Sequence, residues 1–68
     1  MKIIISTLLE KMIDGYESRG AFCKRVGTDQ ATLARYLKRE GGCSARFVAN
    51  VLAQTGVDFE KAFMIVRG

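Results

Sequence analysis

The feature that most constrains this chain is a glycine at position 27, which separates two short stretches of helical pattern. Phe22, Cys23 and Val26 lie at helical spacing before it, and Thr28-Asp29 follows it. A helix that ends in the left-handed conformation does so most cheaply on glycine, and an aspartate just beyond can cap the next helix by accepting from a backbone N–H. The sequence therefore predicts two helices joined at a corner, one over 19–26 with Ser18 as its cap and one over 30–40.

The second of these helices divides into an apolar side and a polar side. Leu33, Tyr36 and Leu37 fall at positions i, i+3 and i+4 and predict its buried seam. The other side places small residues between amide and basic ones, and it consists of Gln30, Ala31, Thr32, Ala34, Arg35 and Lys38. Small side chains let a helix approach a DNA groove closely, while amide and basic side chains donate to base edges. The expected base contacts are Gln30, Ala31, Thr32 and Arg35.

Positive charge is concentrated around the same two helices. Residues 19–46 hold seven basic and two acidic residues, against four basic and five acidic residues in the rest of the chain, whose total charge is +4. Such a cluster is typical of a phosphate-binding surface, although Lys and Arg are also ordinary residues of a solvated helix face. The expected phosphate contacts are Arg19, Lys24, Arg25, Lys38, Arg39 and Arg46.

The stretch from Ser18 to Gly41 resembles the helix-turn-helix of the lambda-repressor-like family, the Cro, repressor and XRE-type regulators of phages and bacteria. In that family a small residue stands four positions before the corner glycine, as Cys23 does here, and apolar residues follow six and nine positions after it, as Leu33 and Tyr36 do. Residues 44–63 look like the family's fourth helix, Gly-Val corner and short fifth helix. The resemblance implies a regulator of transcription, repressor or activator, that binds double-stranded DNA.

The remaining segments predict three more helices and one domain over residues 1–68. We expect a helix over 7–17, with Thr7 and Glu10 spaced as a capping box. Gly15 costs about 1 kcal/mol within it, so an end near Gly15 is the alternative. Ser44 is expected to cap a helix over 45–55, and Asp58 one over 59–66. The fold class that follows is all-α, a compact five-helix bundle.

The residues available for chemistry are few. The chain has no histidine and two cysteines that are not spaced as zinc ligands, so we expect no metal, no cofactor and no enzymatic activity. Cys23 is expected to be core filler, and the alternative of a redox-sensitive thiol is left open for Cys43. The apolar run at 3–5 is too short for a signal peptide or a membrane span, which predicts a cytoplasmic protein with no membrane partner. No small-molecule ligand is expected.

The two ends of the chain are more apolar than a monomer requires. Ile3, Ile4 and Ile5 at the start, and Met64 and Ile65 near the end, predict a surface for self-association. A two-fold homodimer, or a higher oligomer, would set two reading helices about 34–36 Å apart for successive major grooves. The alternative is that residues 3–5 pack over the last helix within one chain.

A second class of function fits the same scaffold. A protein-interaction module, antitoxin-like or a host-takeover protein, would use the basic face against an acidic protein partner. A surface of that kind should expose aromatic or aliphatic anchors, whereas the predicted helix over 30–40 offers Gln30 and Arg35 on its polar side. Binding to double-stranded DNA is therefore the favoured prediction.

Overall fold

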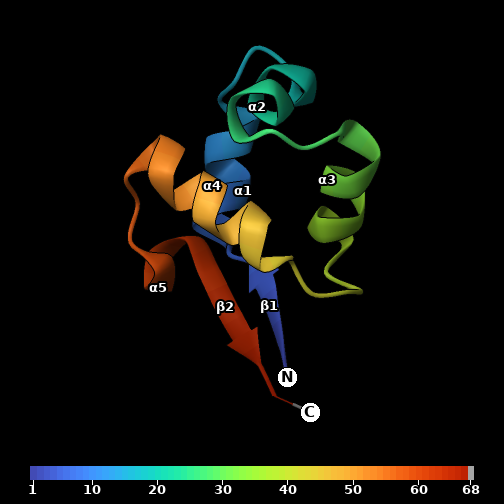
Figure 1. Ribbon diagram of the computed structural model, residues 1–68, viewed down its shortest axis with the longest axis vertical. Coiled ribbons are helices and arrows are strands. Elements are labelled where there is room, and N and C mark those ends of the chain that lie inside the picture. The colour runs from blue at the N-terminus through green and yellow to red at the C-terminus, as the bar shows by residue number, and fades with distance from the viewer. Residues whose placement is uncertain (68) are drawn as a thin grey trace.

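The computed structural model describes residues 1–67 and contains five helices and a two-stranded antiparallel sheet (Figure 1). The elements in chain order are β1 (Lys2–Ile5), α1 (Thr7–Asp14), α2 (Arg19–Val26), α3 (Gln30–Lys38), α4 (Ala45–Thr55), α5 (Phe59–Ala62) and β2 (Phe63–Val66). The sheet lies at one end of the molecule with both chain termini, and α2 lies at the opposite end (Figure 1). No helix in the described part of the chain is long and apolar enough to cross a membrane.

The prediction of an all-α fold is wrong, because the structure is mixed and includes β1 and β2. The helix expected over 59–66 ends at Ala62, and the next four residues form a strand. Its apolar run Phe63-Met64-Ile65-Val66 fits a strand as well as a helix, since a short continuous apolar run has no decisive period. Pairing with β1 decides the outcome because it satisfies the backbone groups of both segments.

The sheet pairs the two ends of the chain residue by residue. Ile5 lies opposite Phe63 and Ile3 opposite Ile65, while Ile4 lies opposite Met64. Residues directly opposite each other share a face, so the Ile5–Phe63 pair marks the side that faces the core, and both residues are buried. The expected alternative, in which residues 3–5 cover the C-terminal segment within one chain, is therefore found, although as a strand pair and not as a cap on a helix.

Three of the predicted helix caps are confirmed. The side chains of Ser18, Asp29 and Ser44 accept hydrogen bonds from the backbone N–H three residues on, and they start α2, α3 and α4 at the expected positions. The prediction for α1 is wrong, because Ser6 and not Thr7 is its N-cap. The Ser6 hydroxyl also donates to the Lys61 carbonyl at 2.6 Å, which fastens the start of α1 to α5.

The remaining helix ends also correct the sequence predictions. The first helix ends at Asp14 with Gly15 as its C-cap, so the alternative end near Gly15 is found and the end at residue 17 is wrong. The third ends at Lys38 and not at residue 40, with Arg39 left-handed at φ 60°. Asp58 precedes α5 but makes no side-chain cap bond. Each difference lies at a terminus, where the balance between one more helical residue and a competing contact is small.

The corner between α2 and α3 is built as the sequence predicts. Gly27 ends α2 in the left-handed conformation, with φ 72° and ψ 35°, and its N–H binds the Cys23 carbonyl. The Asn50 side chain of α4 donates to the Val26 carbonyl at 3.0 Å, so the end of α2 is also fastened to α4. The corner is therefore held by one hydrogen bond within α2 and by another from α4.

Every helix and strand contributes side chains to the core, and the helices do so from their inward faces. The largest fully buried side chains are Phe22, Phe63, Ile5, Leu9, Ile13, Leu33 and Val51. Cys23 is 4% exposed and fills space in this core, as expected. Tyr36 of α3 packs against Phe47 of α4, with ring centroids 4.7 Å apart, so α3 is held against the domain by both Leu33 and Tyr36.

Candidate nucleic-acid interface

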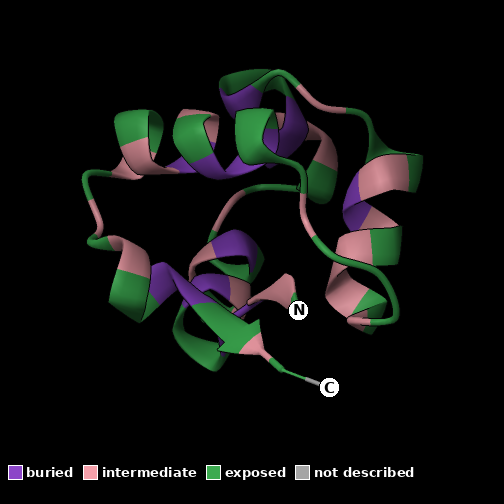
Figure 2. Ribbon diagram, turned by 60° about the horizontal axis from the view of Figure 1, so that its bottom comes forward, coloured by how far each residue is buried: buried purple, intermediate pink, exposed green. Residues whose placement is uncertain are grey.

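The third helix presents one side to the core and the other to solvent, and buried residues line the inward sides of the helices in Figure 2. Leu33 is fully buried, and Tyr36 and Leu37 are partly buried against the core. Four of its residues are exposed, namely Gln30, Ala31, Arg35 and Lys38. Thr32, also predicted to contact a base, is half-buried. No large apolar side chain is exposed on α3.

Thr32 also takes part in the N-cap of α3. Its backbone N–H donates to Asp29 Oδ1 at 2.7 Å. Hydrogen bonds from the Thr32 side chain and backbone lower the pKa of the Asp29 carboxyl, in that order of importance. Thr32 therefore takes part in the cap of its own helix.

An open groove of about 600 Å³ runs between the starts of α2 and α3. Its lining consists of Ser18, Gly20, Ala21, Cys23, Lys24, Thr28, Asp29 and Gln30. One predicted base contact, Gln30, and one predicted phosphate contact, Lys24, therefore share a concave surface. The Gln30 side chain lies so close to α2 that a Cβ added to Gly20 would come within 3.1 Å of Gln30 Nε2.

A second hollow, of about 130 Å³, lies on the other flank of α3. Thr32 and Tyr36 of α3 line it together with Arg46 and Asn50 of α4. Arg46 is exposed and belongs to α4, so it adds a basic side chain to the edge of this hollow. The start of α4 thus supplies a cation beside α3, as the sequence predicts.

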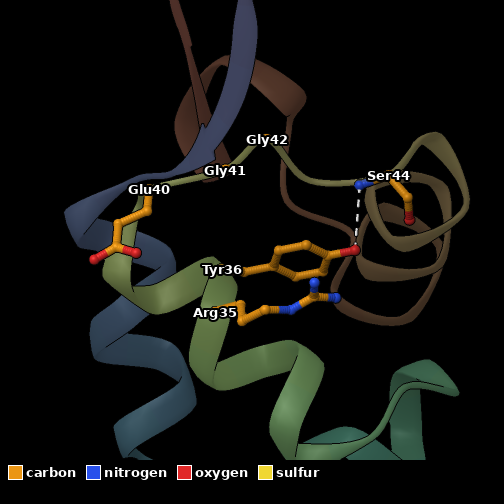
Figure 3. Close-up of a pocket in the computed structure, with 6 residues that line it drawn as sticks. All are labelled: Arg35, Tyr36, Glu40, Gly41, Gly42 and Ser44. Atoms are coloured by element: carbon orange, nitrogen blue, oxygen red, sulfur yellow. Dashed lines mark hydrogen bonds between the residues drawn. The ribbon is translucent and has the colours of Figure 1, made fainter.

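A third hollow, of about 400 Å³, adjoins the end of α3 and contains Arg35 (Figure 3). The side chains of Arg35 and Tyr36 extend side by side from α3 toward Ser44 at the start of α4 (Figure 3). Tyr36 Oη accepts a hydrogen bond from the Ser44 N–H at 3.4 Å. The guanidinium of Arg35 has no hydrogen bond or ion pair among the described residues, which leaves its donors available.

Arg39 stands apart from the other predicted phosphate contacts. Its Nε donates to the Ile5 carbonyl at 3.0 Å, its Nη1 to the Leu37 carbonyl at 3.2 Å and its Nη2 to Glu10 Oε1 at 2.7 Å. All three guanidinium nitrogens are therefore used inside the domain. The arginine fastens the end of α3 to β1 and α1, a role that its sequence position among basic residues concealed.

Three further hydrogen bonds hold the end of α3 and the loop after it on the sheet. Lys2 Nζ donates to the carbonyls of Arg39 at 3.2 Å and Glu40 at 3.0 Å. The Cys43 N–H donates to the Ile3 carbonyl at 2.7 Å, so the loop after α3 runs along β1. Sequence reasoning missed these residues because no local pattern shows that the N-terminal strand would reach the end of α3.

The other predicted cations differ in their surroundings. Arg19, Lys24, Arg25, Lys38 and Arg46 are all exposed. Only Lys24 and Arg46 line one of the hollows beside α3. Arg19 is the first residue of α2 and lies between the groove residues Ser18 and Gly20. Arg25 and Lys38 do not line any of the three hollows described above.

The cysteines show no sign of activation. Burial raises the pKa of the Cys43 thiol to about 11. Burial, and next the charge of Asp29, also raises the pKa of Cys23. A thiol with a raised pKa is a poor nucleophile at neutral pH. Neither cysteine takes part in a cluster of metal-binding side chains within residues 1–67.

No family model, curated protein or solved structure matches this chain.

Proposed function

We propose that this protein is a sequence-specific regulator of transcription that binds double-stranded DNA and reads the major groove with α3. The observation that carries the proposal is the solvent side of α3, where Gln30, Ala31 and Arg35 are exposed and no large apolar residue is. A surface of small, amide and guanidinium groups suits base edges. A protein-binding surface would be expected to expose aromatic or aliphatic anchors there.

Each exposed residue on this side of α3 has a chemical counterpart on a base pair. The Gln30 amide can pair with the N6 and N7 positions of adenine, and the Arg35 guanidinium with O6 and N7 of guanine. The Ala31 methyl can contact the methyl group of thymine without holding the helix away from the groove floor. Together these residues would read a short sequence within one major groove.

The cations beside α3 fit the role of positioning the protein on the duplex. Lys24 lies in the groove on one flank and Arg46 in the hollow on the other. Contacts to phosphates set the register of a reading helix without conveying sequence. A reading helix with a cation on each flank suits a major groove, which phosphates border on both sides.

The exposed apolar side chains lie away from α3 and favour self-association as a second part of the proposal. Leu8 is 46% exposed, Met64 53% and Ile65 51%. Ile5 is in the core and Ile3 packs against it, so three predicted residues are left for self-association: Ile4 and Met64, which are paired on the other face of the sheet, and the exposed Ile65. We propose a homodimer, because one short helix offers few contacts and a second copy doubles them.

Binding to fluorescent duplexes tests the DNA proposal. After selection from a randomised library, the protein should bind the selected duplex more tightly than a scrambled one, as measured by fluorescence anisotropy. Arg35→Ala should reduce that preference about fivefold or more, the lower end of what one bidentate contact contributes. Lys61→Ala is the matched control because it removes the same charge from an exposed position on α5, away from α3. Equal affinity for all duplexes would contradict the proposal.

Sedimentation tests the dimer separately. Met64→Glu with Ile65→Lys keeps the net charge and places two charges on the exposed part of β2. The wild type should sediment as a dimer at micromolar concentration and the double variant as a monomer. A wild-type protein that stays monomeric with and without DNA would refute self-association. The role of α3 in reading DNA is tested independently by the binding assay.

A further inference from the structure

The backbone conformation at Gly20 does not require glycine. Gly20 is the second residue of α2, and its φ is not in the left-handed region, unlike those of Gly27 and Gly56. Glycine is among the poorest residues for a helix, and alanine in the same place would lose less conformational entropy on folding. The explanation for Gly20 must therefore lie in what surrounds it.

The space that a side chain at position 20 would occupy is taken by Gln30. A Cβ on Gly20 would lie 3.1 Å from Gln30 Nε2 and 3.8 Å from Gln30 Cδ. The third atom within 4 Å, Ser18 Oγ, would be 3.6 Å away, which is an ordinary contact. The Gln30 amide thus packs against bare backbone of α2, and a Cβ at position 20 would require the end of the amide to move by a few tenths of an ångström.

The Gln30 side-chain amide packs against Gly20 but makes no hydrogen bond there. No hydrogen bond among residues 1–67 involves the Gln30 side chain, so its donors and its acceptor remain free. The residue nevertheless lies in the groove between α2 and α3, beside Lys24. Packing against Gly20 limits the directions that the amide can take while leaving its hydrogen-bonding groups open to the groove.

We propose that Gly20 is a specificity-determining residue that positions the Gln30 amide for base recognition. The inference rests on the proposed function and adds that sequence preference belongs to α2 and α3 together. The lack of a Cβ at position 20 lets the amide lie back against α2, and this sets where it meets a base edge. Binding groups need to be held within about 0.5 Å of their productive position, and a Cβ at 3.1 Å from Nε2 requires the amide to move by a few tenths of an ångström, which uses most of that tolerance.

Substitution of Gly20 should separate specificity from stability. Gly20→Ala should raise the midpoint of urea unfolding, since alanine is the better helix former. It should also reduce the preference at the base pair that Gln30→Ala affects, by about threefold or more, which is below the effect of losing a whole bidentate contact. In the Gln30→Ala background the same substitution should leave the preference unchanged. Gly41→Ala is the control, because no atom lies within 4 Å of its added Cβ.

The outcomes distinguish this role from others. A uniform loss of affinity for every duplex would show that Gly20 only admits the DNA backbone, and an unchanged preference would show that it does nothing for Gln30; either result overturns the inference. A wild-type protein with no duplex preference overturns the proposed function itself. Nuclear Overhauser contacts between the Gln30 amide protons and the Gly20 α-protons check the packing without DNA, and their absence would refute the positioning.

Discussion

Replacing Arg39 by alanine should destabilise the fold by about 2–3 kcal/mol, although the residue is neither hydrophobic nor fully buried. The ion pair joins side chains that are 31% and 42% exposed, for Arg39 and Glu10, so solvent screening limits it to about 0.5–1 kcal/mol. Each of the two bonds to the Ile5 and Leu37 carbonyls adds about 0.5–1.5 kcal/mol. The left-handed backbone contributes nothing to the difference, because alanine and arginine both carry a Cβ.

Urea unfolding followed by circular dichroism measures this cost in a chain small enough for two-state analysis. Arg39→Gly should be about 1 kcal/mol less destabilising than Arg39→Ala, since glycine relieves the positive φ of 60°. Glu10→Gln should cost less than either, and Lys38→Ala, at an exposed neighbour, should stay within about 0.5 kcal/mol of the wild type. If Arg39→Ala matched Lys38→Ala, the junction of α3, β1 and α1 would not depend on the guanidinium.

Three further changes test other parts of the fold. Gly27→Ala should cost about 1 kcal/mol in urea unfolding through its φ of 72°, while Gly41→Ala should cost almost nothing; equal costs would remove the corner argument. Hydrogen bonds lower the pKa of Asp29, so its ionised form stabilises the fold above its unfolded pKa and that contribution disappears as the pH falls through the lowered value. Asp29→Asn should therefore lose less stability than the wild type between neutral pH and about pH 2, and parallel curves would count against the cap. Alkylation of Cys43 by iodoacetamide should be slow at neutral pH and still accelerate near its pKa of about 11, whereas a rate that levels off near neutrality would indicate an activated thiol.

The parts of the fold that the sequence predicted correctly are those determined by neighbours along the chain. The bounds of α2 and α4 follow from Ser18 and Ser44 as caps and from Gly27 and Gly56 as left-handed ends. A cap acts on a backbone group three residues away, so its effect is readable from a short window. Four of the six residues predicted for the solvent side of α3 are exposed for the same reason, since the helical period and the position of Leu33 determine them, while Thr32 and Ala34 are half-buried.

The parts that sequence reasoning missed depend on partners far along the chain. The run at 63–66 becomes a strand because residues 2–5 lie beside it, and nothing local distinguishes it from a continuation of α5. Arg39 looks like one more cation in a basic stretch until Glu10 and the Ile5 carbonyl are brought to it. The proposed role of Gly20 likewise depends on the Gln30 amide, which packs against it from the next helix.

The salt dependence of duplex binding tests the central claim most directly. If α3 lies in a major groove with phosphates bound beside it, log affinity should fall linearly with log salt, with a slope of about −0.9 for each phosphate contact. Between about 50 and 200 mM salt, Arg46→Ala should reduce that slope by about one unit, while Lys61→Ala and Arg39→Ala should leave it unchanged. An affinity that does not respond to salt, or a slope that Lys61→Ala lowers as much as Arg46→Ala, would contradict the proposed interface.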